Sequence, residues 1–249
     1  MASNLSIRTR AESLELKKAA HVIEQAAWSE LGYLNFTRAH YDHYSALLEE
    51  YPEYQLCLYD EESGYPVAAA NCVPISCDGP ESLPPEGWDW VVESAAGRAG
   101  KPANMLGALA ISVPAVHRNK GYARVMINAL LDLAERKNLR GLVAPVRPSA
   151  KAAHPETTIE EYITWTDERG RVFDPWLRSH LAAGGRLIGP CKRSMVVEER
   201  LAFWETWSKR QFDKTGAYMI DGALTPVQID VEAQVGRYEE PNVWVAYRC

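Results

Sequence analysis

Apolar and polar residues alternate along this chain with two periods, which predicts interleaved strands and helices. A run of apolar residues at 104–113 is typical of a buried strand. After a short polar loop, apolar positions recur every three or four residues, which predicts a helix over 121–137. A β-branched run at 141–146 predicts the next strand. The centre of the chain therefore reads as strand, helix and strand, the succession of an α/β protein.

The flanking segments continue this alternation. Before the centre we expect a strand at 5–10, helices at 11–27 and 37–50, and a hairpin of 54–59 with 65–75. After it we expect helices at 158–165, from Asp174-Pro175 to Gly184-Gly185, and at 199–210, with strands at 186–197, 217–230 and 242–247 and turns at 237–241. Residues 77–103 are rich in proline and glycine, so we expect an irregular loop there.

Composition limits the class of protein. A chain of 249 residues can bury a large core, and a net charge of −6 argues against general nucleic-acid binding. No apolar stretch reaches the roughly 20 residues that span a bilayer, and the N-terminus lacks a signal peptide's apolar core, so we expect no membrane contact. Five scattered cysteines fit reduced thiols in a cytoplasm, and no metal site is expected.

Charge is reversed locally. Between residues 118 and 151 there are eight Lys or Arg but only Asp132 and Glu135 on the acidic side. A basic region on an acidic protein suits a polyanionic ligand bound in one place. For Arg136, Lys137 and Arg140 the simpler interpretation is that they complement the C-terminal end of a helix.

The start of the central helix has the chemistry of a phosphate site. Gly121 and Ala123 leave little side-chain bulk where the helix begins, so backbone N–H groups can approach an anion. The first turn of a helix has N–H groups without partners and carries the positive end of the helix dipole. Arg118 and Lys120 add charge beside it. The sequence thus predicts a phosphate-binding loop between a strand and a helix.

This pattern, Arg118-x-x-Gly121-x-Ala123, resembles the acyl-CoA-binding loop of the GNAT (Gcn5-related N-acetyltransferase) superfamily. The whole chain resembles a bacterial group of GNAT proteins with Arg-Pro-Ser-x-Lys at 147–151 and Glu-Pro-Asn-Val-Trp at 240–244. One departure is that Pro114 lies four residues before the arginine, whereas family members often have proline three before it.

The resemblance implies a GNAT fold in a single domain over 1–249, with a loop insertion at 77–103 and a C-terminal extension at 198–249. Such a fold has a central mixed, mostly antiparallel sheet of about seven strands, flanked by helices. The strands at 104–113 and 141–146 would form its parallel pair and splay apart, and the pantetheine arm of the donor would enter the gap.

The resemblance also implies the reaction and its donor. The donor is acyl-CoA, or acyl-phosphopantetheine on an acidic acyl-carrier protein, and the acceptor is the amine of a small molecule. The amine attacks the thioester directly within one ternary complex. The backbone beside Ile111 and Val113 would polarise the thioester carbonyl. The phosphates would be held by the loop, namely Arg118, Asn119, Lys120, Gly121, Tyr122, Ala123 and Arg124.

The two proton carriers are harder to assign. Residues 104–113 contain no acid, base or tyrosine, so the glutamate that many GNAT proteins carry there as base has no counterpart. The usual acid of the family is a tyrosine on the helix after the fifth strand, and Tyr162 is the nearest match in order. His154 is a candidate base. Tyr162 has an alternative role in packing a helix face.

Four residues are candidates for substrate binding. Arg147 and Lys151, after a strand end, suit a carboxylate on either substrate or the pantetheine phosphate. Trp88 either closes over an apolar acceptor or anchors its loop to the body. Glu240 either lines the acceptor cleft or belongs to a turn. Thioester decarboxylation without transfer and non-catalytic acyl-CoA binding remain alternative functions, and both a monomer and a homodimer fit.

Overall fold

One open sheet organises the chain in the computed structural model, which describes residues 4–98 and 100–248. Its nine strands run in the order β1-β2-β3-β4-β5-β9-β8-β7, and β6 pairs with the other edge of β9. The strands are β1 (Leu5–Thr9), β2 (Gln55–Asp60), β3 (Tyr65–Ile75), β4 (Met105–Ser112), β5 (Gly141–Val146), β6 (Arg186–Arg200), β7 (Gly216–Tyr218), β8 (Val227–Asp230) and β9 (Val235–Arg248). All pairs are antiparallel except β4–β5, which confirms the expected sheet type.

The parallel pair opens toward its carboxyl end, as expected. β4 and β5 pair only at Leu106↔Leu142 and Gly107↔Val143, although both strands continue for several residues. Where β3 meets β4, the pairing steps from Ala110 to Ala108, which leaves Leu109 as an extra residue. Such a bulge bends a strand and turns it from its neighbour. The gap between the two strand ends is therefore a property of the backbone.

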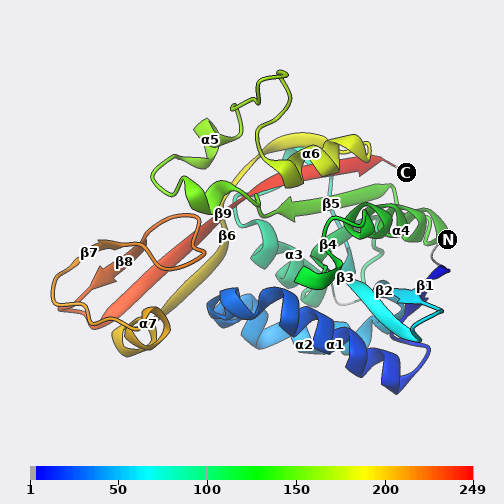
Figure 1. The fold of residues 1–249 in the computed structure, drawn as a ribbon, viewed down its shortest axis with the longest axis horizontal. Coiled ribbons are helices and arrows are strands. Elements are labelled where there is room, and N and C mark those ends of the chain that lie inside the picture. Colours follow the sequence, from blue (N-terminus) through cyan, green and yellow to red (C-terminus); the bar gives the residue numbers. More distant parts are fainter. Residues whose placement is uncertain (1–3, 99, 249) are drawn as a thin grey trace.

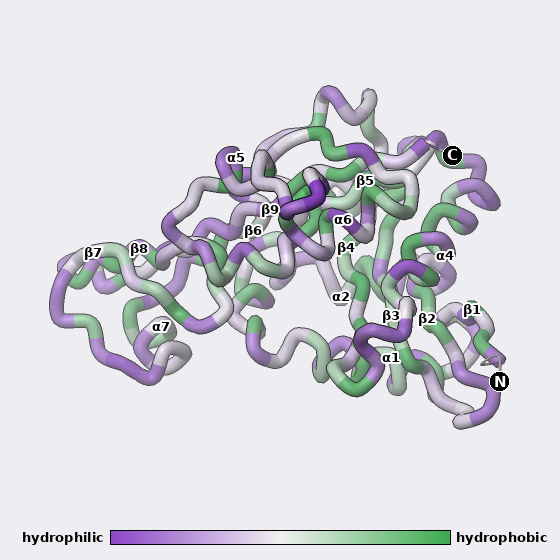
Figure 2. The backbone as a smooth tube through the Cα atoms, turned by 45° about the horizontal axis from the view of Figure 1, so that its top comes forward, coloured by the Kyte–Doolittle hydropathy of each residue, from purple (hydrophilic) through white to green (hydrophobic). Residues whose placement is uncertain are grey.

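Helices cover both faces of the sheet (Figure 1). The α-helices are α1 (Leu14–Trp28), α2 (Ser45–Glu50), α3 (Gly87–Ala96), α4 (Tyr122–Arg136), α5 (Ile159–Tyr162), α6 (Pro175–Ala182) and α7 (Leu201–Ser208). A 3-10 segment, η1 (Ser29–Phe36), and a short π-helix, η2 (His40–Tyr44), lie between α1 and α2. Apolar residues of α4 pack on one face with Leu106 and Leu142, whereas α3 packs on the other with Val143. β3, β4 and β5 are mostly hydrophobic along the backbone (Figure 2).

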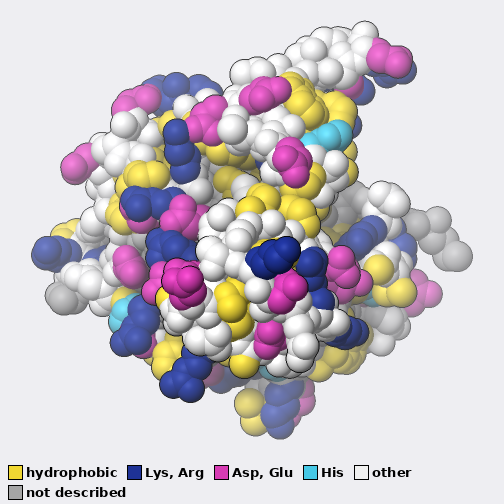
Figure 3. Space-filling view, turned by 90° about the vertical axis from the view of Figure 1, so that its left-hand side faces the viewer, with side chains coloured by type: hydrophobic (Ala, Val, Ile, Leu, Met, Phe, Trp, Pro, Cys, Tyr) yellow, Lys and Arg dark blue, Asp and Glu magenta, His cyan; other side chains and the backbone are white. Residues whose placement is uncertain are grey.

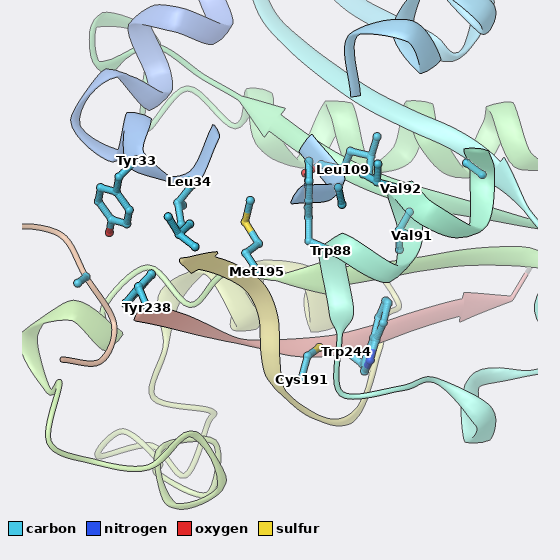
Figure 4. Packing of buried hydrophobic residues seen from close by; sticks show 14 of the residues in the cluster. Tyr33, Leu34, Trp88, Val91, Val92, Leu109, Cys191, Met195, Tyr238 and Trp244 are labelled. Carbon is cyan, nitrogen blue, oxygen red and sulfur yellow. The ribbon is translucent and has the colours of Figure 1, made fainter. Parts of the chain in front are cut away.

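The segment 77–103 contains a helix, so the expectation of an irregular loop was wrong. Trp88, Val91, Val92 and Ala95 of α3 are buried in the core. A Cβ on Gly107 of β4 would lie 2.6 Å from Val91, so the helix sits tightly on the sheet. The apolar spacing of α3 was present in the sequence, but the surrounding prolines and glycines concealed it. Figure 4 shows Trp88 beside Leu109 and Met195 in this core.

The C-terminal region also differs from expectation. Residues 237–241, expected to form turns, lie inside β9, and only 217–218 and 227–230 of the expected strand 217–230 are extended. β9 pairs with β5 at one end and with β8 at the other, while β6 follows it along most of its length. The segment expected as an extension therefore supplies a central strand of the sheet. Its outer part, with α7, β7 and β8, projects from the body as an arm (Figure 1).

The surface at the end of the arm shows basic and acidic side chains interspersed rather than gathered by sign (Figure 3). Among the described residues, no helix is long and apolar enough to cross a membrane.

Candidate active site

The phosphate loop has the backbone that its sequence predicts. Gly121 has φ +78° and Asn119 has φ +63°, both in the left-handed region. A Cβ on Gly121 would meet nothing within 4 Å, so glycine is needed there for its conformation and not for space. α4 begins directly after Gly121 without a side-chain cap. The N–H of Arg124 already donates to the carbonyl of Gly121 at 3.1 Å. Within the described residues, the first-turn N–H groups of Tyr122 and Ala123 are therefore left open to an anion.

The basic residues of this region divide into two groups. Arg118, Lys120 and Arg124 are exposed, and none forms an ion pair within the described part of the chain. In contrast, Lys137 pairs with Glu53 at 3.5 Å, and Arg140 donates to the carbonyl of Cys77 at 2.7 Å. Arg136, which the sequence interpretation grouped with Lys137 and Arg140, is also exposed and forms no ion pair among the described residues, so the division holds for Lys137 and Arg140 only.

A cavity of about 880 Å³ reaches from the loop into the protein. Its donor end is formed by the splayed strand ends 108–113 and 144–146 with Arg118, Ala123, Trp176 and His180. Its acceptor end is formed by α1, η1, η2 and α2 together with Trp88, Arg147, Met195, Glu240 and Asn242. The cavity thus joins the parallel-strand gap to a second chamber under the N-terminal helices.

Two of the predicted substrate-binding residues meet in the acceptor end. Arg147 donates from Nε to Glu240 Oε1 at 2.9 Å, and Tyr238 donates its hydroxyl to Glu240 Oε2 at 2.8 Å. Glu240 is fully buried, so its charge requires these partners. Arg147 also donates to the carbonyl of Gly222. Burial lowers the pKa of Arg147, but the Glu240 carboxylate together with Tyr238 and Tyr33 outweighs this effect, and the net shift is upward.

An aromatic wall lines the acceptor end. His40, from the π-helix η2, stacks on Tyr44 with ring centroids 4.6 Å apart and on Trp88 at 5.9 Å. Burial lowers the pKa of His40 to about 4, so its imidazole is neutral near pH 7. Trp88 lines the cavity and also donates Nε1–H to the carbonyl of Leu109 at 2.8 Å. It therefore anchors α3 to the bulge of β4, which is the second of the two roles considered for it.

The end of β4 carries a polar group that the sequence did not single out. Ser112 is fully buried, and its Oγ accepts a hydrogen bond from Trp28 Nε1 at 2.8 Å. Both residues line the cavity, as do Ile111 and Val113. The indole N–H thus holds the Ser112 oxygen in place as an acceptor, and the hydroxyl hydrogen must point in a different direction from the indole.

His180 of α6 is a second polar cavity residue that the sequence did not single out. It is 4% exposed and lines the donor end of the cavity. Its Nδ1 lies 2.6 Å from the hydroxyl of Tyr247. A histidine one turn before the helix-ending Gly184-Gly185 was a visible signal, but its partner lies 67 residues away.

Among the six candidates for proton transfer and substrate binding, three lie outside the cavity-lining set. Tyr162 is buried and donates its hydroxyl to Asp174 at 2.9 Å, and the ring of His154 packs edge-on against Trp165 at 4.9 Å. Lys151 is fully buried, and its Nζ donates to the carbonyls of His154 and Leu224 at 2.8 Å each. These contacts correct the expectation that Lys151 meets a substrate anion, because its ammonium is used by the fold. Tyr162 serves the packing role that was its alternative.

Within the described residues no group of His, Cys, Asp or Glu is arranged to hold a metal ion.

Comparisons with known proteins agree with this geometry. The sequence model of the Acetyltransferase (GNAT) family matches residues 21–156. Arginine N-acetyltransferase avaD from Aspergillus versicolor is 34% identical over 204 residues, which are 73% of this chain and 70% of that protein. The chain therefore belongs to the GNAT acetyltransferase family and is an N-acyltransferase.

Solved structures share the fold over nearly the whole chain. The loading GNATL domain of CurA from Lyngbya majuscula is 17% identical, with a TM-score of 0.61 over 98% of this chain and 97% of that one. The GphF GNAT-like decarboxylase in complex with isobutyryl-CoA is 18% identical, with a TM-score of 0.59 over 98% of both chains. At this identity they show the fold alone.

Proposed function

We propose that this protein transfers an acetyl group from acetyl-CoA to the primary amine of a small molecule, by direct attack in a ternary complex. The observation that carries the proposal is the continuous cavity that joins the phosphate loop and strand gap to a separate chamber under the N-terminal helices. A donor and an acceptor that must meet without a covalent enzyme intermediate need such a continuous space.

The donor end fits a thioester with a phosphate handle. The first-turn N–H groups of α4 and the unpaired Arg118, Lys120 and Arg124 bind the phosphates. The pantetheine arm lies between β4 and β5, where the strand ends separate. The backbone beside Ile111 and Val113, with the buried Ser112 hydroxyl, polarises the thioester carbonyl.

The acceptor end receives the amine as a neutral nucleophile. His40 is neutral near pH 7 and lines the cavity, so its imidazole accepts a hydrogen bond from the incoming N–H. As the C–N bond forms, the nitrogen loses a proton and the C–S bond breaks with its electron pair on sulfur. The sulfur finally gains one proton, so the reaction moves a proton from nitrogen to sulfur. Arg147 and Glu240 hold the far wall of this chamber through their ion pair.

Arginine is the first acceptor to test, because the relative at 34% identity is an arginine N-acetyltransferase. The protein is incubated with acetyl-CoA and arginine, then with other amines, and products are identified by mass. An amine that gains one acetyl group, with release of an equal amount of CoA, is the expected result. Acetyl-CoA that persists with every amine contradicts the proposal.

Thioester decarboxylation is a second candidate, because residues 104–113 contain no acid, base or tyrosine to take a proton from an attacking amine. Malonyl-CoA distinguishes the two functions, since decarboxylation converts it to acetyl-CoA and carbon dioxide without any amine. The same assay with an acyl group on an acidic carrier protein tests the alternative donor.

We propose a cytoplasmic location, where CoA is available and thiols stay reduced; the four described cysteines are free and buried.

A further inference from the structure

His180 occupies an unusual position for a buried polar side chain. It lies on α6, is 4% exposed and faces the donor end of the cavity. One ring nitrogen, Nδ1, is 2.6 Å from the hydroxyl of Tyr247 on β9. The other, Nε2, is buried and has no hydrogen-bond partner among the described residues. A buried polar atom without a partner is costly, so its place beside a substrate cavity points to a partner in the substrate.

The contact with Tyr247 determines which nitrogen carries hydrogen. Burial raises the pKa of Tyr247, so its hydroxyl stays protonated, and burial lowers the pKa of His180 to about 4, so the ring is neutral near pH 7. The hydroxyl has one other acceptor in reach, the carbonyl of His180 at 3.4 Å. We assign the hydroxyl as the donor to Nδ1, the nearer of its two acceptors, and this assignment places the ring hydrogen on Nε2.

No acidic group competes for this Nε2–H. Asp174 is the carboxylate that acts on His180 electrostatically, and its oxygens accept hydrogen bonds from Trp176 N and Leu177 N at the start of α6 and from Ala150 N and Tyr162. The ring of Trp176 lies edge-on to His180 with centroids 4.3 Å apart and holds it in place. His180 is thus a fixed, uncharged donor at the end of the cavity where the thioester enters.

We propose that His180, oriented by Tyr247, donates a hydrogen bond from Nε2 to the thioester sulfur and stabilises the thiolate that forms when the C–S bond breaks. The inference rests on the thioester donor of the proposed function. The electron pair of the C–S bond stays on sulfur, and the hydrogen stays on Nε2. The proton that finally neutralises the sulfur is the one that the attacking nitrogen releases. His180 therefore lowers the free energy of the negative charge that forms on sulfur, and the ring neither gains nor loses a proton in doing so.

The test measures the thiol pKa of CoA bound to the full chain, followed by the ultraviolet absorbance of the thiolate. A donor at sulfur favours the thiolate, so the wild-type protein should lower this pKa below that of free CoA by about one unit. His180→Ala should abolish the shift, and His180→Gln, which keeps an N–H at similar reach, should retain part of it. Tyr247→Phe should reduce it, because the ring can then place its hydrogen on Nδ1. His43→Gln, outside the cavity-lining set, is the matched control.

A second readout separates a role at sulfur from a structural role. His180→Ala should slow transfer from acetyl-CoA about tenfold or more, with much less loss from an acetyl thioester of an acidic aryl thiol, whose thiolate needs little stabilisation. Equal losses with both donors, or an unchanged thiol pKa in His180→Ala, overturn the inference while leaving the proposed function intact. A wild-type protein that binds no CoA overturns both.

Discussion

The two ends of the cavity are built in opposite ways. The donor end consists mainly of backbone, namely the first turn of α4, a left-handed Gly121 and two strands that separate, with the neutral side chains of Ser112, Trp176 and His180 beside it. Its charged side chains are exposed and unpaired. The acceptor end consists of buried side chains whose charges and hydroxyls bind one another, as Glu240 does with Arg147 and Tyr238. The donor end is therefore open to any ligand that carries a phosphate group. The acceptor end is a surface of defined shape whose charges neutralise one another.

This difference assigns the functions of the two ends. Backbone N–H groups at a helix start bind a constant feature of the donor, whatever acyl group it carries. A balanced ion pair within an aromatic chamber selects by shape, because its charges are already satisfied. Specificity for the amine should then depend on residues such as His40, Trp88 and Arg147, and affinity for the donor should not.

The largest effect should follow from Gly121→Glu. The variant forces a side chain into a left-handed backbone and puts a carboxylate where phosphate binds, so acetyl-CoA affinity should fall at least about 100-fold. The measurement is isothermal titration with acetyl-CoA. Gly170→Glu is the matched control, because Gly170 also has a positive φ, +71°, and open space around its Cβ position. Undiminished affinity in Gly121→Glu would disprove the phosphate loop.

Glu240→Gln tests the other end. It leaves Arg147 without its counter-charge in a mostly buried site, so the free energy of unfolding should fall by about 3 kcal/mol. Denaturant unfolding checks this value. Glu198→Gln removes a carboxylate from the exposed pair with Arg237 and should cost about 0.5 kcal/mol or less. If the two variants are equally stable, the acceptor end is not the balanced surface described above.

Acid should weaken the fold through the cavity histidines. His40 and His180 have pKa values lowered from 6.5 to about 4 by burial, so the unfolded chain binds their protons first. The two neutral rings therefore contribute fully to the free energy of unfolding above about pH 6.5. As the pH falls toward 4, the free energy of unfolding drops by about 1 kcal/mol per pH unit for each ring. The slope of the unfolding free energy against pH across this range should be smaller in His40→Gln and in His180→Gln than in the wild-type protein. A slope unchanged by both substitutions would show that these rings are not buried.

Arg118→Ala should have a smaller effect, confined to the donor end. Loss of one exposed cation beside the phosphates should weaken acetyl-CoA binding about tenfold, and added salt should narrow the difference. Titrations at low and high salt measure it. Arg136→Ala, on the last turn of α4, is the control and should change affinity little. Equal losses in both variants would mean that only the net charge of the region matters.

The smallest effect on activity should come from Tyr162→Phe. The hydroxyl binds Asp174 and lies outside the cavity-lining set, so the rate of acetyl transfer should stay within about twofold while stability falls by about 1 kcal/mol. Steady-state rates and thermal unfolding together check this. A large loss of the transfer rate at unchanged stability would contradict the packing role and support a catalytic role for Tyr162.

The same contrast explains what the sequence could predict. The donor end is specified by neighbours in sequence, since Arg118, Gly121 and Ala123 lie within one turn and one loop. The helix α4 and the strands β4 and β5 followed from local periodicity, whereas the mixed sheet and its parallel pair followed from the resemblance to the GNAT superfamily. Glu240 and Arg147 were candidates individually, but their ion pair joins residues 93 apart. His180 and Tyr247 meet only because β9 returns to the centre of the sheet beside α6, and no local pattern carries that information.

A crystal structure of the protein with CoA bound tests the central claim most directly. We expect phosphate oxygens within hydrogen-bond distance of the N–H groups at the start of α4, the pantetheine arm between β4 and β5, and the sulfur in the cavity beside His180. CoA bound outside the gap between these strands, or with its phosphates away from Gly121, would contradict the division of the cavity into a backbone-built donor end and a side-chain-built acceptor end.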